Sequence, residues 1–270
     1  MVVWYNGRFV PDGQVGEMIL TPALRQARGV FSTLLLKAGK AVWLEEHIKR
    51  LENSAQELFR LVLHSSEIRK AALEWPKYSN ITDGIMRLVV WEEKGQLAVL
   101  VLGDKVHIEQ QASPVKLQQS YCIRHTSDIT VRHKTFSRLI LELECERAIN
   151  EGFDEALFLN EHGAVTETSK HNFFFVRDGI INTPCIDCGL LPGIGRMELM
   201  CLAQENDMEV KEGFYTLEEV LRSDEAFVIN AVRGVIPVAV INDREWSVPG
   251  PKTKELAAMW RDAVEREVLR

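Results

Sequence analysis

Apolar stretches broken by turn signals run through the first 110 residues and predict an antiparallel sheet with helices. The dipeptide Asn6-Gly7, between two strand-like runs, favours a type I′ hairpin. Apolar residues recur at three- and four-residue steps over residues 44–63, which predicts an amphipathic helix. A second helix over residues 67–75 is expected to stop at Pro76, because proline lacks a backbone N–H. The remaining predictions for this half are strands over residues 2–5, 8–10, 31–37, 41–43, 85–91 and 96–102 and a loop or short helix over 22–28.

The second half follows a polar segment, residues 107–114, which ends in proline and predicts a domain boundary. Many short strands broken by helices then predict a distorted β-barrel. The chain is therefore predicted to be an α+β protein with an N-terminal domain over residues 1–110 and a barrel domain with helices over 115–270. The elements predicted for the second half are strands over residues 115–124, 155–160, 165–167, 172–176, 208–214, 226–230 and 234–240 and helices over 135–150, 196–206 and 253–269, with a capping box starting a short helix at Thr216.

Charge and hydropathy exclude several classes of partner. The 270 residues carry a formal net charge of -7, which argues against a nucleic-acid partner. No run approaches the roughly 18 apolar residues that a membrane span needs. Residues 1–8 contain a turn and a charge too early for the apolar core of a signal peptide. We therefore expect a cytoplasmic protein.

The five cysteines are an odd and scattered set, which is a poor disulfide framework. Cys185 and Cys188 form a C-x-x-C motif, but no second pair and no histidine pair lies nearby at the spacing that zinc requires. The seven histidines include no H-E-x-x-H motif. We predict no metal site and expect reduced structural thiols, with thiol-redox chemistry as the alternative.

Four features could carry chemistry together, although each has an ordinary structural explanation. Lys134 precedes a predicted helix, and a partly desolvated lysine can form a Schiff base and then act as a base. Glu167 ends a short strand, where a carboxylate can face a pyridine nitrogen. Gly193-Ile194-Gly195 opens a helix, whose free N–H groups favour an anion. Arg50 can bind a phosphate, and Asn230-Ala231 can add N–H donors. Taken singly, they are solvated charges and a loop-to-helix turn.

The order and spacing of these motifs resemble those of the fold-type IV pyridoxal-phosphate (PLP) enzymes. This family includes branched-chain aminotransferases, D-amino-acid aminotransferases and 4-amino-4-deoxychorismate lyases. The segments that carry the resemblance are Gly29-Val30-Phe31-Ser32-Thr33, Glu46-His47 with Arg50-Leu51, Glu155-Ala156-Leu157, Val165-Thr166-Glu167 with Asn172, and Leu191-Pro192-Gly193-Ile194.

The resemblance implies a role for each candidate residue. Lys134 would be the lysine that links the cofactor, and Glu167 would face the pyridine nitrogen. The phosphate would be held by Arg50, by the N–H groups of Ile194 and Gly195, and by Asn230 and Ala231. The resemblance also implies a homodimer with its sites near the subunit interface and a small amino compound as substrate.

Two segments favour the lyase among the members of this family. Arg138-Leu139, four and five residues after Lys134, is similar to the lysine segment of the lyases, whereas branched-chain transaminases tend to have Asn-Tyr there. Asn230-Ala231 stands where transaminases place a Gly-Thr or Ser-Thr pair, and Gly195 removes a second hydroxyl. The leading prediction is a lyase that forms p-aminobenzoate and pyruvate in folate biosynthesis. The alternatives are an aminotransferase for D- or branched-chain amino acids and a catalytically silent cofactor-binding protein.

The residues that would bind the substrate carboxylate are where the chain departs from the family. Ala27-Arg28 replaces the usual Gly-Asp before Gly29, and Glu92-Glu93-Lys94 stands where a substrate-binding arginine often follows the strand. The sequence therefore leaves five unranked candidates for this contact, namely Arg28, Arg87, Arg124, Arg132 and Arg233.

Overall fold

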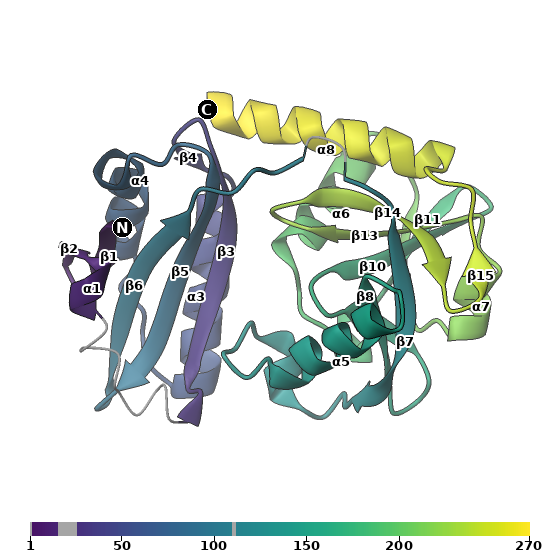
Figure 1. Cartoon of the computed structure of the whole chain (residues 1–270), viewed down its shortest axis with the longest axis horizontal. Coiled ribbons are helices and arrows are strands. Elements are labelled where there is room, and N and C mark those ends of the chain that lie inside the picture. The colour runs from purple at the N-terminus through teal and green to yellow at the C-terminus, as the bar shows by residue number, and fades with distance from the viewer. Residues whose placement is uncertain (1, 16–25, 110–111) are drawn as a thin grey trace. The chain divides into compact units, whose positions relative to one another are not determined.

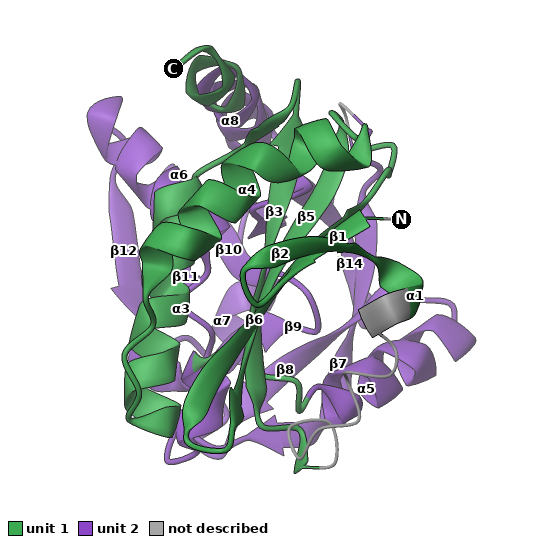
Figure 2. Cartoon of the chain, turned by 90° about the vertical axis from the view of Figure 1, so that its left-hand side faces the viewer, with its two compact units in different colours: residues 1–108, 133–137, 264–270 green, residues 109–132, 138–263 purple. Residues whose placement is uncertain are grey.

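The computed structural model describes residues 2–15, 26–109 and 112–270. The described chain forms two compact units (Figure 2). Unit 1 holds the chain up to Ile108, and unit 2 begins at Glu109, inside the segment predicted as the domain boundary. Two later segments, His133–Ser137 and Val264–Arg270, also belong to unit 1. A division of the chain at one boundary, as predicted from the sequence, places both segments in the second domain.

Unit 1 is an antiparallel sheet with strand order β2-β1-β6-β5-β3-β4. One face carries α3 and α4, whose apolar side chains join those of the strands in one core. The opposite face carries a smaller apolar cluster that includes Tyr5, Trp91 and Leu100. The elements of unit 1 are β1 (Val2–Tyr5), β2 (Arg8–Pro11), α1 (Asp12–Val15), β3 (Gly29–Lys37), β4 (Lys40–Ala41), α3 (Leu44–Phe59), α4 (Ser65–Ser79), β5 (Gly84–Glu93) and β6 (Gln96–Asp104) (Figure 1).

Unit 2 is built on a closed barrel of six strands. The pairing runs β10-β13-β14-β7-β8-β9, and β9 pairs with β10 at Glu167 and Asn172, which closes the ring. The predicted distorted barrel is therefore confirmed. The strands of unit 2 are β7 (Val115–Arg124), β8 (Glu155–Asn160), β9 (Val165–Thr168), β10 (Asn172–Arg177), β11 (Ile180–Pro184), β12 (Val210–Gly213), β13 (Glu225–Asn230), β14 (Gly234–Ile241) and β15 (Arg244–Glu245).

Helices and short 3-10 turns complete unit 2. Thr216 starts α7 with both hydrogen bonds of the predicted capping box, because its side chain accepts from Glu219 N and Glu219 bonds back to its amide. None of the described helices is both long and apolar enough to cross a bilayer. The remaining elements are η1 (Ile129–Arg132), α5 (Leu139–Asn150), η2 (Ile186–Cys188), α6 (Ile194–Glu205), α7 (Leu217–Leu221) and α8 (Pro251–Leu269), of which α8 contributes its residues from Val264 onward to unit 1.

Most of the predicted elements are confirmed, and in unit 1 the strands β1 and β2 form one hairpin and β5 and β6 another. Asn6 and Gly7 in the first, and Lys94 and Gly95 in the second, have positive φ, as a type I′ turn requires. Some predictions were wrong in extent, and some elements were not predicted. The helix of residues 67–75 does not stop at Pro76, which lies buried inside α4. The strand of residues 41–43 ends at Ala41, β11 was not predicted, and α5 begins at Leu139 instead of residue 135. The predicted segment 22–28 lies mostly outside the described residues.

Candidate active site

The segment His133–Ser137 is not helical because it pairs with the start of β3 through the bridge between Thr135 and Val30. Phe31 N donates to Lys134 O (2.9 Å), and Phe136 N donates to Gly29 O (2.9 Å). Gly29 is required here, since a Cβ at this position would lie 2.2 Å from a ring carbon of Phe136. This pairing overrides the helix predicted from residue 135. It places the ammonium nitrogen of half-buried Lys134 5.0 Å from the centre of the Phe31 ring.

A polar cluster lies under the other face of β3, where α3 packs. Nη2 of Arg50 donates to Ser32 Oγ (2.6 Å), and the same hydroxyl lies 2.7 Å from Nδ1 of His47. Because Arg50 donates a hydrogen bond to Ser32 Oγ, the Ser32 hydroxyl can direct its own hydrogen to Nδ1 of His47. The neutral His47 ring then carries its own proton on Nε2.

Arg50 has the properties of an anion-binding residue. Among the residues that the structure describes, no carboxylate forms an ion pair with Arg50, and its Nε has no hydrogen-bond partner. Burial lowers the pKa of Arg50 to about 10. A desolvated guanidinium without a counter-charge is costly, and a bound phosphate would supply both the charge and the missing acceptor.

His47 gives unit 1 a predictable dependence on pH. Burial, followed by the charges of Arg50 and Lys134, lowers the pKa of His47 well below its ordinary value of 6.5. The unfolded chain therefore binds a proton near pH 6.5 that the folded chain does not. The contribution of His47 to the free energy of unfolding is therefore fully present above pH 6.5. As the pH drops below this value, the free energy of unfolding falls by about 1.4 kcal/mol per pH unit because of this one residue.

We expect His47→Asn to flatten the dependence of the unfolding free energy on pH between about 6.5 and 5. Urea unfolding at a series of pH values measures it. His162→Asn is the matched control, because the His162 side chain is exposed. Equal slopes in His47→Asn and the unchanged protein would contradict the assignment of a neutral His47.

In unit 2, the carboxylate of Glu167 is surrounded by hydrogen-bond donors. Nη2 of Arg124 lies 3.0 Å from Glu167 Oε1, and both side chains are largely buried. Leu191 N donates to the same oxygen (3.2 Å), and Asn172 Nδ2 donates to Oε2 (3.1 Å). Such donors stabilise the negative charge and fix the plane of the carboxylate. Glu167 is thus held as an oriented anion.

The N-terminus of α6 packs directly on the turn between β13 and β14. A Cβ on Gly195 would lie 2.7 Å from Asn230 C and 2.9 Å from Ala231 N, so only glycine allows this approach. The N-cap residue Gly193 offers no capping side chain. The first N–H groups of a helix have no partner within it, and no described residue accepts a hydrogen bond from the amides of Ile194 and Gly195. Asn230 Oδ1 accepts from Val232 N (3.0 Å) and Arg233 N (2.8 Å), which shapes the turn.

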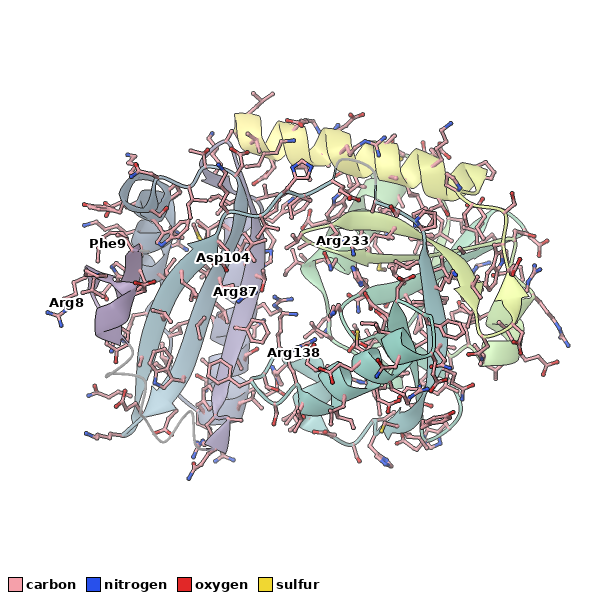
Figure 3. All side chains as sticks on the ribbon, in the orientation of Figure 1. Arg8, Phe9, Arg87, Asp104, Arg138 and Arg233 are labelled. Carbon is pink, nitrogen blue, oxygen red and sulfur yellow. The ribbon has the colours of Figure 1, made fainter. Side chains whose placement is uncertain are left out.

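The structure sorts the five arginines that the sequence left unranked. Arg28 pairs with Glu92 (3.6 Å), Arg124 with Glu167, and Arg132 with Asp187 (3.1 Å). Arg87 and Arg233 have no carboxylate partner among the described residues. Arg87 pairs across strands with Thr33, on the face of the sheet that also carries Phe31 (Figure 3). Lys134 lies over that phenylalanine ring, so Arg87 and Lys134 lie on the same side of the sheet of unit 1.

Arg138 holds the turn that follows Glu167 in unit 2. Its Nη2 donates to Ser169 O (2.7 Å), and its Nε lies 3.5 Å from Glu142 (Figure 3). The side chain of Leu139 is largely exposed. Within unit 2, the arginine of the lyase-like Arg138-Leu139 pair therefore has a structural contact and the leucine does not.

The predicted site residues thus fall into two groups. Lys134 and Arg50 lie in unit 1, whereas Glu167, Ile194, Gly195, Asn230 and Ala231 lie in unit 2. Sequence reasoning did not assign the partners that orient these groups, namely Ser32, His47, Arg124 and Asn172. Ser32, His47 and Asn172 stood inside the motifs, so their position was the available signal. Nothing in the sequence distinguished Arg124 from the other arginines.

The curated relatives of this chain are named for two different reactions, amino transfer and lyase cleavage. A branched-chain-amino-acid aminotransferase of Pseudomonas aeruginosa is 29% identical over 97% of this chain and 92% of its own length. An aminodeoxychorismate lyase of Bacillus subtilis is 27% identical over 99% of this chain and 96% of its own length. The two are similarly close, so the lyase is not favoured over the aminotransferase by these comparisons.

Solved structures share the fold of the whole chain. The branched-chain aminotransferase of Thermoproteus uzoniensis with norvaline has a TM-score of 0.91 at 27% identity and covers 99% of this chain and 95% of its own. A T.th. branched-chain amino acid aminotransferase complexed with N-(5'-phosphopyridoxyl)-L-glutamate has a TM-score of 0.89 at 26% identity, over 98% and 94%. The family model for amino-transferase class IV matches residues 29–241. The chain therefore belongs to the amino-transferase class IV family, whose members are PLP enzymes of both reaction types.

Proposed function

We propose that this chain is a PLP-dependent lyase that converts 4-amino-4-deoxychorismate to p-aminobenzoate and pyruvate on the route to folate. The family supports the cofactor, and two segments of the chain support the lyase. The proposal rests on the chemistry that the site residues offer within each unit.

The residues present fit the chemistry of that cofactor. Arg50 is a desolvated cation with an orphaned Nε, which suits a phosphate. The free amides at the start of α6 suit the same anion. Glu167, held as an anion by Arg124, suits a protonated pyridine nitrogen. Lys134 supplies the amine that an aldehyde requires.

The observation that carries the lyase is the contact of Gly195 with the β13–β14 turn. A threonine at position 195 would push its Cβ into the backbone of Asn230 and Ala231. The turn itself is shaped by the Asn230 side chain, and Ala231 stands where transaminases place the threonine of their Gly-Thr or Ser-Thr pair. Both hydroxyls typical of the transaminases are thus missing from this chain, and this fits the lyase pattern.

The reaction needs one proton transfer and one bond cleavage. When bound, PLP supplies an electron sink for the substrate carbon that bears the amine. Lys134 Nζ takes the proton from that carbon, and Glu167 holds the positive charge of the pyridine ring. The bond between the neighbouring ring carbon and the enolpyruvyl oxygen then breaks, which leaves an aromatic ring. The departing enolpyruvate takes up the proton and becomes pyruvate. We assign Arg87 to a substrate carboxylate, because it lacks a counter-charge among the described residues.

The test is to incubate the PLP-loaded protein with aminodeoxychorismate and to measure p-aminobenzoate by chromatography. We expect the PLP-loaded protein to form p-aminobenzoate. We expect it to transfer few amino groups from D- or branched-chain amino acids to 2-oxoglutarate. Robust amino transfer without p-aminobenzoate would overturn the lyase in favour of the aminotransferase. Absence of both products from protein that binds PLP would indicate the silent binding protein instead.

The aminotransferase is the second candidate, favoured by the names of the relatives. Several curated relatives are branched-chain aminotransferases, and so is the structure with norvaline. The half-reaction of such an enzyme converts the cofactor to its amine form, which changes its absorbance. A spectral change with valine or D-alanine alone would therefore support this candidate.

We also propose a homodimer, from an exposed apolar surface on unit 2. β7 and α5 are neighbours, and both present large apolar side chains to solvent. Large exposed apolar surfaces mark sites of association with other proteins or with membranes. Light scattering is expected to give twice the mass of one chain, and Leu143→Glu is expected to lower it. A single-chain mass for the unchanged protein would refute the dimer. The side chains concerned are Tyr121, Ile123, Leu139, Ile140 and Leu143.

A further inference from the structure

The C-x-x-C motif forms a tight turn that brings its two sulfurs together. Cys188 N donates to Cys185 O (3.0 Å) around η2, and the two Sγ atoms lie 3.7 Å apart. Residues at the ends of such a turn have Cα atoms less than about 7 Å apart, which a disulfide can bridge. Both cysteines are free thiols. The sequence alone predicted two structural thiols and could not supply this distance.

The residues that leave the turn hold Glu167 and its partners. Gly189 O accepts from Arg124 Nε (3.1 Å), and Leu191 N donates to Glu167 (3.2 Å). Leu191 O accepts from Nδ2 of Asn172 (2.8 Å), and this amide also bonds Glu167. All of these contacts lie inside unit 2. A change in the turn therefore acts on the residues that orient the carboxylate.

We propose that Cys185 and Cys188 are a modification site, at which a hydroperoxide or a disulfide oxidant forms a reversible intramolecular disulfide that weakens cofactor binding. With a hydroperoxide, Cys185 gains a hydroxyl on sulfur while the oxidant leaves as an alcohol or as water. The Cys188 sulfur then attacks Cys185, and the S–S bond forms as water leaves. With a disulfide oxidant, Cys185 first forms a mixed disulfide and releases one thiol, and the attack of Cys188 on Cys185 releases the second. By either route two thiol hydrogens are lost in total, and the oxidant takes both electrons.

Burial decides which thiol reacts first. Cys185 is half-buried, whereas Cys188 is fully buried and donates to Gly213 O (3.6 Å). Burial and the neighbouring Cys185 raise the pKa of Cys188 to about 12. Cys188 therefore stays protonated while Cys185 meets the oxidant, and it acts second as the resolving thiol.

Closing the disulfide must move the turn. The two sulfurs are 3.7 Å apart, and an S–S bond is about 2.0 Å long, so they approach each other by about 1.7 Å. The contact of Cys188 with Gly213 O is lost, and Gly189 follows Cys188 directly. A shifted Gly189–Leu191 segment releases one or two of the hydrogen bonds around Glu167. The loss of such a bond corresponds to about a three- to tenfold weaker affinity.

The test treats the full-length protein with hydrogen peroxide and, separately, with oxidised glutathione. Mass spectrometry of the peptide that contains Cys185 and Cys188 is expected to show the loss of two hydrogens. Titration of the unfolded protein is expected to fall from five thiols to three. PLP titration by absorbance is expected to give about a three- to tenfold higher dissociation constant, which dithiothreitol restores.

Two variants separate this site from general oxidation. Cys185→Ser is expected to keep its PLP affinity after oxidant, and Cys201→Ser, which removes an exposed cysteine, is expected to behave as the unchanged protein. A peptide that keeps its hydrogens, a disulfide between two chains, or an intramolecular disulfide with unchanged PLP affinity would each overturn the proposal. The predicted change in PLP affinity depends on the proposed cofactor and not on the proposed lyase activity. The peptide mass decides the disulfide even if the lyase proposal fails.

Discussion

Lys134→Ala is expected to abolish the absorbance band of lysine-linked PLP and to lower the rate of product formation by about a thousandfold or more. Nζ of Lys134 is both the amine that links the cofactor and the base that takes the substrate proton, and a positioned base alone contributes about 10²- to 10⁴-fold. The band is measured on the purified variant after addition of PLP. The rate is measured with saturating substrate.

The control for this prediction is Lys49→Ala. Lys49 is exposed on α3, one residue before Arg50, so its loss removes the same charge from unit 1 without touching the segment on β3. We expect Lys49→Ala to keep both the band and the rate. If Lys134→Ala retained the band while Lys49→Ala lost it, the assignment of the linking lysine would be refuted.

Arg124→Met is expected to lower the free energy of unfolding by about 3–5 kcal/mol, because it leaves the buried carboxylate of Glu167 without its counter-charge. Arg124 also donates to Gly189 O and Val131 O, so those carbonyls lose a donor too. Thermal or urea unfolding of the cofactor-free protein measures the loss. We expect weaker PLP binding in the same variant, since Glu167 is no longer held as an oriented anion.

Two further variants make this prediction specific. Arg132→Met breaks a comparable ion pair with Asp187, but that pair is exposed, so we expect a change of less than about 1 kcal/mol. The double variant Arg124→Met with Glu167→Gln removes the uncompensated charge and is expected to recover part of the lost stability. Equal losses in Arg124→Met and Arg132→Met, or additive losses in the double variant, would count against a buried pair.

Local patterns in the sequence predicted most elements, because alternation and helical spacing record which face of each element is buried. They failed where a contact with another part of the chain decided the backbone. The helix predicted from residue 135 begins only at Leu139, since Thr135 and Phe136 are engaged by β3. Pro76 stays inside α4, where it is buried. A proline removes only one hydrogen bond of a helix, so packing can outweigh it.

The candidate site was predicted residue by residue, but its internal contacts were not. The motifs supplied the amine, the carboxylate, the arginine and the glycine-rich helix start. They did not indicate that Ser32 and His47 support Arg50, or that Arg124 pairs with Glu167. Arg124 had been only one of several candidates for the substrate. Strand β8 lies between β7 and β9, and its registers with both strands bring Arg124, at the end of β7, within reach of Glu167 on β9.

The sequence by itself determined the kinds of element, the family resemblance and the residue types that the chemistry requires, because these depend on spacing along the chain. Only the tertiary structure decided which of them meet. Gly29 is a glycine because of the Phe136 ring, and Gly195 because of the Asn230 and Ala231 backbone. Each pair is distant in sequence, and no local pattern encodes a close approach between two such segments.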